Sequence, residues 1–388
     1  MTLPHLISIN DLSTSEMESI FVLAQAYLEE LGDVQSPSRI GRSTEACRGA
    51  IMATLFYEPS TRTRLSFESA MIRLGGSVIS SADPRASSAV KGESLADTVR
   101  IVSGYADLIA LRHPREGAAK LAAEYASVPV INGGDGAHEH PTQTLCDLFT
   151  IRREKGALSG LNVAVLGDLQ GGRTVHSLVY ALARFGATIT TAPAGGLSLP
   201  ESVDWRLRNE FGCERLSGND LGAGTPVGAT YRPRGQPTGS RPSVDVLYLT
   251  RFQKERASQE IREYPMVNRE LLSIPGLRNA LVMHPLPRVK ELDIALDADP
   301  RAAYFRQASY GVPIRMALVT HILEHSSTQA STSGGHLSLA QQSDFVCANP
   351  NCISRDIVEA QTAPAKFVVV VPRRLRCFYC EHEIPAAR

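Results

Sequence analysis

Hydroxyl and guanidinium groups are concentrated in one short stretch, Ser60-Thr61-Arg62-Thr63-Arg64. It follows an apolar run at residues 51–57, typical of a buried strand, and opens a segment with helical periodicity. Backbone N–H groups exposed at a helix start, together with hydroxyl and guanidinium donors, suit a phosphate group. The pattern therefore predicts an anion site; the alternative is a Ser/Thr helix cap beside two surface arginines.

Two further polar groups follow in the first half of the chain. A loop at residues 87–93 contains Ser87 and Lys91, and Lys91 is a candidate for reaching a phosphate, although a solvated lysine is the simpler explanation. Arg112 follows an apolar strand pattern, and residues at the carboxyl ends of parallel strands line ligand crevices. A surface arginine is the alternative.

His140 stands at the start of a predicted helix, in His140-Pro141-Thr142-Gln143. A histidine at a helix N-terminus is disfavoured as a cation, so we expect a neutral imidazole that donates to a carbonyl oxygen. A histidine that only caps the helix is the alternative.

The second half of the chain has three polar segments, each directly after a predicted strand: 173–174, 251–256 and 284–288. They are expected to face one crevice, where Arg173 and Arg251 would bind two carboxylates in fork geometry. A nucleotide site is disfavoured there, because residues 167–172 lack the glycine spacing of a dinucleotide-binding turn.

Four of the seven cysteines form two close pairs, Cys347 with Cys352 and Cys377 with Cys380. This spacing is a strong signal for a tetrahedral zinc ion, with disulfides as the alternative. Four cysteine ligands leave no open position, so the site would be structural, and so small a module would need its metal to fold.

The pattern of elements predicts an α/β protein with two doubly wound parallel-sheet domains plus a small C-terminal β-rich zinc-binding domain. A capped helix is expected at residues 13–30 and an irregular loop in the Gly/Pro-rich stretch 217–242. The expected domains are 1–150 and 151–325, with a closing helix at 300–325 that returns to the first domain. A linker at 326–343 then leads to a zinc domain at 344–388.

Composition narrows the class of protein. The 40 Lys and Arg balance the 40 Asp and Glu, so a nucleic-acid partner is not expected. The longest β-rich apolar run is far too short to cross a membrane, and residues 1–10 do not resemble a signal peptide. We expect a cytoplasmic protein in a reducing compartment.

Four motifs together resemble the aspartate carbamoyltransferase family. They are Ser-Thr-Arg-Thr-Arg at 60–64, His-Pro-Thr-Gln at 140–143, Arg-x-Gln-Lys-Glu-Arg at 251–256 and His-Pro-Leu-Pro-Arg at 284–288. The resemblance extends over residues 1–325. The C-terminal module resembles the zinc domain of that enzyme's regulatory chain, here fused to the catalytic chain, while the regulatory chain's nucleotide-binding domain is absent.

The resemblance implies transfer of the carbamoyl group of carbamoyl phosphate to L-aspartate, giving N-carbamoyl-L-aspartate and phosphate in de novo pyrimidine (UMP) biosynthesis. No catalytic cofactor is implied, only structural Zn²⁺. The implied catalytic residues are Arg62, Thr63, Arg112 and His140. The implied carbamoyl-phosphate ligands are Ser60, Thr61, Arg62, Thr63, Ser87, Lys91, Arg112, His140, Gln143, Leu286 and Pro287. The implied aspartate ligands are Lys91, Arg173, Thr174, Arg251 and Gln253.

The family further implies a homotrimer in which Ser87 and Lys91 reach the neighbouring subunit's site, with paired trimers through the zinc domain as a larger assembly. Two other functions are weighed against this one. A carbamoyltransferase for ornithine is disfavoured, because Arg173 and Arg251 would repel a cationic acceptor. A catalytically inactive zinc-bearing scaffold is disfavoured, because every matched catalytic position is filled.

Overall fold

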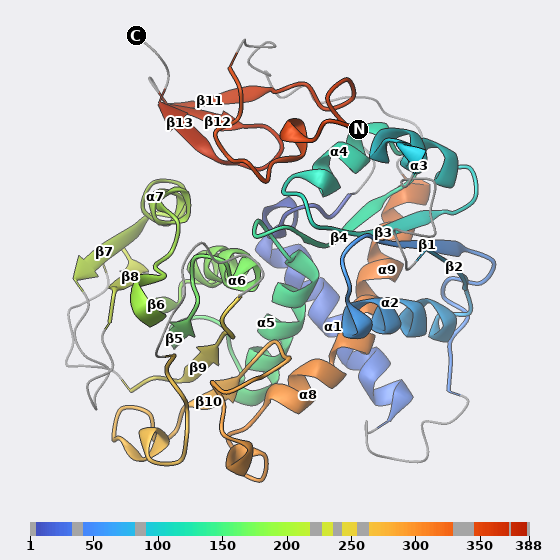
Figure 1. Cartoon of the computed structure of the whole chain (residues 1–388). Helices are drawn as coiled ribbons and strands as arrows, with labels where there is room; N and C mark the ends of the chain where they lie inside the picture. The colour runs from blue at the N-terminus through green and yellow to red at the C-terminus, as the bar shows by residue number, and fades with distance from the viewer. Residues whose placement is uncertain are drawn as a thin grey trace. The chain divides into compact units, whose positions relative to one another are not determined.

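The computed structural model describes residues 5–32, 42–81, 91–217, 227–235, 243–253, 264–328, 345–371 and 374–385. The chain forms two compact units (Figure 1). The first consists of Met1–Thr142 with Val312–Arg388, and the second of Gln143–Gly311. Each unit is built around a β-sheet whose central strands are parallel.

The first unit has a four-stranded sheet in the order β2-β1-β3-β4, in which neighbouring strands run parallel. Its strands are β1 Ile51–Phe56, β2 Ser77–Ser81, β3 Leu108–His113 and β4 Val130–Asp135. The helices between them are α2 Thr61–Arg73, α3 Leu95–Val102 and α4 Ala118–Tyr125. Strand–helix–strand connections of this kind place the ligand-facing loops at the carboxyl edge of the sheet.

Helix α1, Thr14–Leu31, confirms the predicted capped helix. Its N-cap is Ser13, whose hydroxyl accepts from the Glu16 amide while the Glu16 carboxylate accepts from the Ser13 amide. Near the other end of the chain, α9 Gly311–Thr328 returns to this unit, where the Thr320 and Tyr27 hydroxyls lie 2.9 Å apart. Helix α9 continues through residues 326–328, so the predicted linker begins too early; residues 329–344 lie outside the described residues.

The second unit has a six-stranded sheet in the order β10-β9-β5-β6-β8-β7. Its strands are β5 Asn162–Gly167, β6 Thr188–Pro193, β7 Cys213–Ser217, β8 Ala229–Pro233, β9 Val246–Leu249 and β10 Leu281–Met283. Its helices are α5 Pro141–Lys155, which begins at the end of the first unit, α6 Arg173–Arg184, α7 Glu201–Asn209 and α8 Tyr304–Ser309. Strands β6, β5, β9 and β10 are parallel neighbours, as predicted.

Part of the Gly/Pro-rich stretch is ordered as a strand, which the sequence did not predict. Ala229–Pro233 pairs antiparallel with both β6 and β7, so β8 and β7 together extend the parallel sheet by two strands. Alternation explains this strand, because Ala229 and Tyr231 are buried while the residues between and after them are less so. Residues 218–226 and 236–242 lie outside the described residues.

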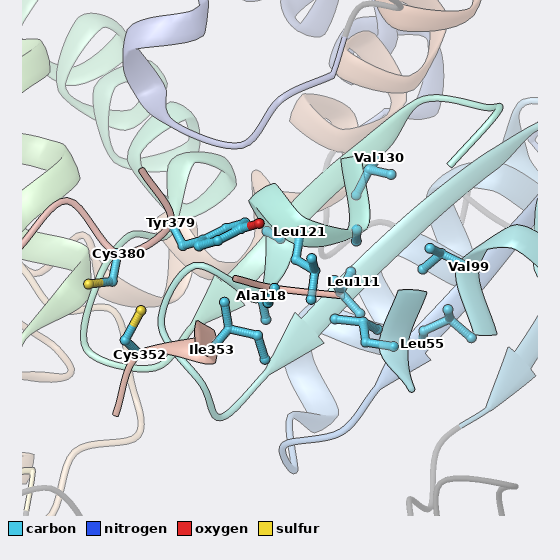
Figure 2. Close-up of a cluster of buried hydrophobic side chains, with 14 of the residues drawn as sticks. Leu55, Val99, Leu111, Ala118, Leu121, Val130, Cys352, Ile353, Tyr379 and Cys380 are labelled. Atoms are coloured by element: carbon cyan, nitrogen blue, oxygen red, sulfur yellow. The ribbon is translucent and has the colours of Figure 1, made fainter. Parts of the chain in front are cut away.

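The C-terminal module has a three-stranded antiparallel sheet, formed by β11 Phe367–Val371, β12 Arg374–Cys377 and β13 Glu383–Pro385. This module belongs to the first unit, packs on the rest of that unit and shares one hydrophobic core with it (Figure 2). In that core, Ile353 and Tyr379 of the module lie beside α4 and strand β3. Burial of such side chains stabilises the arrangement by roughly 25 cal/mol per Å² of apolar surface.

One glycine permits this close packing. Gly117, the N-cap of α4, has φ +82°, a left-handed conformation that favours glycine. A β-carbon at this position would lie 2.5 Å from the Tyr379 carbonyl carbon and 2.7 Å from its oxygen. The backbone of the module therefore contacts the backbone of the first unit at a position where a side chain would not fit.

In the described parts of the chain, the remaining helical elements are short 3₁₀ turns at Ile9–Asp11, Ala194–Gly196, Leu271–Ser273, Ile294–Leu296 and Ile353–Arg355. Across the residues that the structure describes, no helix combines the length and apolarity needed to cross a membrane.

Candidate active site and metal centre

The predicted phosphate-binding motif lies between β1 and α2. Ser60 is the N-cap of α2, yet its hydroxyl makes no capping hydrogen bond, so it is not used in holding the helix start. Thr61 and Arg62 are exposed, whereas Thr63 is buried. The helix start therefore presents hydroxyl, guanidinium and backbone N–H donors together, an arrangement that suits an anion.

Arg112 lies beside this motif because β3 neighbours β1. Arg112 pairs in register with Phe56 at the end of β1, and its carbonyl accepts from the Tyr57 amide at 2.8 Å. Its guanidinium donates to the Glu58 carboxylate and to the Gly133 carbonyl, each at 3.2 Å. The carboxylate and the carbonyl hold the cation in place at the carboxyl edge of the sheet.

His140 is 4% exposed and precedes the first residue of α5. Its Nδ1 lies 3.4 Å from the hydroxyl of Thr142, and that hydroxyl accepts from the buried guanidinium of Arg315 at 3.5 Å. Thr142 therefore connects the imidazole to the Arg315 guanidinium at the start of α5.

The predicted loop residues are placed only in part. Lys91 is exposed at the start of the segment that leads to α3, and Ser87 lies outside the described residues. Their predicted role in a neighbouring subunit's site stays a prediction.

In the second unit, three predicted segments meet at one edge of the sheet. Strand β9 pairs with β5 on one side and with β10 on the other, all in parallel. The carboxyl ends of these strands therefore lead into the segments of Arg173, Arg251 and His284, which lie at neighbouring positions. Arg173 is 5% exposed at the start of α6, and Thr174 follows it half-buried.

Asp168 connects the first two of these segments. Its carboxylate accepts from the Gly171 amide at 2.8 Å and from the Gln253 amide at 3.1 Å. The Tyr264 hydroxyl accepts from the Asp168 amide and donates to the Thr250 carbonyl, both at 2.6 Å. These bonds hold Gln253 close to the glycine turn before α6, whereas residues 254–256 of the same motif lie outside the described residues.

The segment after β10 is held by a buried histidine. Nδ1 of His284 accepts from the Leu286 amide at 2.8 Å, so its proton is on Nε2, which donates to Glu291 at 3.0 Å. Burial would raise the pKa of Glu291, but the hydrogen bonds from His284 and from backbone amides outweigh burial and hold the pKa below its usual value. Leu286 has φ 55°, and the Leu286–Pro287 peptide is cis.

The four cysteines of the C-terminal module form one buried cluster. Their sulfur atoms all lie within 4.8 Å of one another, with Cys347 Sγ 3.6 Å from Cys380 Sγ and Cys352 Sγ 3.8 Å from Cys377 Sγ. A disulfide would need about 2.05 Å, whereas a tetrahedron with metal–sulfur bonds of about 2.3 Å gives separations near 3.8 Å. The geometry and the four-thiolate donor set fit a closed structural metal site.

The metal-binding module is attached to the first unit by polar contacts as well as by the shared core. The Glu116 amide donates to the Asn351 carbonyl at 3.0 Å, and the Ile353 amide donates to the Glu116 carbonyl at 2.9 Å. Glu124 of α4 accepts from the Tyr379 hydroxyl at 2.9 Å and from Lys366 at 2.7 Å. The contacts continue at Arg115 with Asp356, at Tyr125 with Thr362 and at Leu95 with Glu359.

His138 joins the module to the loop after β4. Its Nδ1 lies 3.1 Å from the Asp135 carboxylate, and its Nε2 lies 3.7 Å from that of Glu381, the residue after Cys380. Burial would lower the pKa of His138, but the two carboxylates favour the charged form and raise the pKa well above its usual value. The protonated imidazole is therefore an ionic link between the module and the first unit.

Comparison with known proteins adds to this geometry. Three family models match the chain. The aspartate/ornithine carbamoyltransferase carbamoyl-P binding domain matches residues 4–153, and the corresponding Asp/Orn binding domain matches residues 223–322. The metal binding domain of the aspartate carbamoyltransferase regulatory chain matches residues 343–387.

Curated relatives are more specific. The aspartate carbamoyltransferase catalytic subunit of Thermoplasma acidophilum is 45% identical over 323 residues, which cover 82% of this chain and 97% of the relative. That of Methanocaldococcus jannaschii is also 45% identical, over 82% of this chain and 98% of the relative. The chain belongs to the aspartate carbamoyltransferase family.

Solved structures of aspartate carbamoyltransferases agree with this membership. The M. jannaschii catalytic subunit is similar to this chain with a TM-score of 0.68 and 42% identity, covering 84% of this chain and all of the other. The enzyme from Trypanosoma cruzi, in complex with carbamoyl phosphate and aspartate, gives a TM-score of 0.65 and 37% identity over 82% of this chain and 96% of the other. The two solved catalytic chains cover 84% and 82% of this chain, and the metal-binding module is matched by the third family model at residues 343–387.

Several residues that contact the candidate site residues or the metal-binding module were not predicted from the sequence. They are Glu58 beside Arg112, Asp168 and Tyr264 in the aspartate half, Asp147, Gln307 and Glu291 near the 284–287 segment, and Glu116 and Glu124 below the module. Most contact partners far away in the chain, so no local pattern marks them. Glu58 and Asp168 are the exceptions, because each lies at the end of a predicted strand, as Arg112 and Arg251 do.

Proposed function

We propose that this chain transfers the carbamoyl group of carbamoyl phosphate to the amine of L-aspartate, giving N-carbamoyl-L-aspartate and phosphate for pyrimidine synthesis. The observation that carries the proposal is the 45% identity to catalytic subunits over nearly their whole length. The anion-binding groups support it, since they follow parallel strands in each unit.

In the first unit, we assign the phosphate to Ser60, Thr61, Arg62 and Thr63 at the start of α2. Arg112, His140 and Thr63 would hold the carbonyl oxygen. An N–H of the His140 imidazole and the Arg112 guanidinium are donors of the kind that stabilise an oxyanion as the amine attacks. The carbon–nitrogen bond forms, the carbon–oxygen bond to phosphate breaks, and the proton that the amine loses leaves on the phosphate, so no side-chain nucleophile is needed.

In the second unit, we assign the aspartate carboxylates to Arg173, Arg251 and Gln253, with Thr174 nearby. Gln143 and the Leu286 carbonyl would receive the carbamoyl amino group, with Pro287 shaping that turn. Much of the rate enhancement would come from holding the two anionic substrates in attack geometry.

We further propose that the four-cysteine site binds structural Zn²⁺ and that the chain is a catalytic chain fused to a regulatory-type zinc domain. Thiolate ligands and closed tetrahedral geometry favour zinc among the common divalent metals. We also propose that the chain forms a homotrimer in the cytoplasm. In this trimer, Ser87 and Lys91 would complete the neighbouring subunit's site.

The test is a product assay with the purified full-length chain. Carbamoyl aspartate should form from carbamoyl phosphate and aspartate, and ornithine should not replace aspartate. An Arg62→Ala variant should lose nearly all activity, while Arg184→Ala, a change at the far end of α6 from Arg173, serves as the matched arginine control. Turnover of ornithine alone would refute the proposed acceptor, and an Arg62→Ala variant with unchanged turnover would refute the proposed phosphate site.

A further inference from the structure

A buried carboxylate lies next to the residues assigned to the carbamoyl amino group. Asp147 is on α5 with 0% of its side chain exposed. One of its oxygens accepts from the amides of Gln143 at 2.8 Å and Gln307 at 2.6 Å, and the other accepts from the Tyr248 hydroxyl at 2.8 Å. A buried charge with several donors of this kind holds its neighbours firmly, because losing any of them is costly.

The carboxylate determines which way the Gln143 amide faces. A carboxylate accepts hydrogen bonds and does not donate them, so the NH2 end of Gln143 must face Asp147. The carbonyl oxygen at the other end of the same amide is then presented as an acceptor. An amino group is a suitable partner for that oxygen, whereas a methyl group is not.

The same carboxylate acts on the 284–287 segment through Gln307. With its NH2 bound to Asp147, Gln307 turns its carbonyl oxygen toward the His284 amide, which donates to it at 3.0 Å. His284 in turn accepts from the Leu286 amide at 2.8 Å. Asp147 is therefore connected to the Gln143 side chain directly and, through Gln307 and His284, to the amide of Leu286, the residue whose carbonyl is the second assigned acceptor.

We propose that Asp147, with Gln307, is a positioning residue that orients both acceptors and so makes the site select a carbamoyl group over an acyl group of the same shape. This inference rests on the proposed function and deepens it. Asp147 acts through its neighbours: it fixes the direction of the Gln143 amide and the place of the turn at Leu286.

Two stable phosphonates test the proposal by isothermal titration calorimetry on the full-length chain. Phosphonoacetamide carries an amino group where acetonylphosphonate carries a methyl group, and the two are otherwise alike. The wild-type chain should bind the amide at least about tenfold more tightly, since a site built for hydrogen bonds rejects an analogue that cannot form them. Asp147→Asn can donate to Gln143 and allow its amide to reverse, so this preference should fall to about threefold or less.

Two further variants serve as control and as replacement. Tyr248→Phe also removes one hydrogen bond to Asp147. Tyr248 is not part of the hydrogen bonds that connect Asp147 to Gln143 or, through Gln307, to His284, so the preference should stay at the wild-type value. If circular dichroism shows that Asp147→Asn is unfolded, Gln307→Met tests the proposal in its place. This variant removes only the hydrogen bonds that connect Asp147 to His284 and should still reduce the preference.

The outcomes separate this inference from the proposed function. A preference that falls in Asp147→Asn or Gln307→Met and persists in Tyr248→Phe supports the positioning role. A preference unchanged in the first two variants, or lost equally in all three, overturns it. Binding of the two phosphonates is measured without aspartate. A chain that selects the amide but forms no carbamoyl aspartate therefore refutes the proposed reaction and leaves the positioning role supported.

Discussion

Replacing Gly117 by alanine should displace the metal-binding module from the rest of the first unit. The left-handed backbone at Gly117 costs an alanine roughly 1–2 kcal/mol wherever it occurs. The new methyl carbon would also lie 2.5 Å from the Tyr379 carbonyl carbon, against the 3.5–4.0 Å of an ordinary carbon contact. The module must therefore retreat by about 1 Å, and overpacking of this kind typically costs about 1–3 kcal/mol more.

Gly156→Ala is the matched control for this change. Gly156 has nearly the same φ, +81°, but a β-carbon added there would meet nothing within 4 Å, so this variant carries only the backbone cost. The two variants should therefore differ by about 1–3 kcal/mol, which corresponds to a roughly 5- to 150-fold higher population of chains with the module displaced.

Urea unfolding followed by circular dichroism measures the difference in stability between the two variants. Transfer of the bound metal to a chromogenic chelator measures exposure of the cysteine site, since Tyr379 directly precedes the ligand Cys380. Gly117→Ala should release the metal faster than Gly156→Ala. Equal unfolding midpoints and equal release rates in the two variants would refute the reasoning that backbone contact at Gly117 holds the module.

Three further predictions concern the contacts of the module, its metal site and the Asp168 carboxylate of the second unit. The pKa of His138 is raised, so its stabilising charge is fully present below about pH 6.5 and is lost as the pH rises through the higher folded pKa. The free energy of unfolding should therefore fall with rising pH more in the wild type than in His138→Gln. Parallel pH profiles of the two chains would contradict this. Removal of the metal by a chelator should unfold the module and expose the apolar surface of α4, which a hydrophobic dye would report; unchanged dye binding would count against the four-cysteine site. Asp168→Asn should raise KM for aspartate about three- to tenfold, because it weakens the hold on the Gln253 amide, and leave carbamoyl phosphate binding unchanged; an equal effect on both substrates would argue against a local role.

Local features of the chain were predictable from sequence, because the residues that cause them are close together. Ser13 and Glu16 determine the start of α1 within one helical turn. The pairs Cys347 with Cys352 and Cys377 with Cys380 are each separated by only a few residues, and the β-branched run at 367–371 between the pairs is itself a local signal for a strand. The loop residues after β1, β3, β5, β9 and β10 followed from the rule that parallel strands present ligands at their carboxyl ends.

The supporting contacts could not be predicted, because they depend on which distant segments meet. Asp147 reaches Gln307 over 160 positions of sequence, and Tyr379 reaches Glu124 over 255. Neither Asp147 nor Glu124 has a local signature, because the sequence alone does not distinguish a buried acid from an exposed acid on an amphipathic helix. Strand β8 was missed for another reason: its Gly- and Pro-rich surroundings predict a loop, while its own alternating residues and two neighbouring strands favour a sheet.

Because the metal-binding module lies on α4 of its own chain, its attachment is an intramolecular equilibrium. The local concentration of module near α4 is then determined by the connecting segment, typically in the millimolar range for short tethers, and not by the amount of protein present. Dilution that would separate two independent chains leaves this contact occupied. Each chain also contains one module, because the module and the remainder of the chain are covalently linked. One gene therefore encodes both surfaces of the contact.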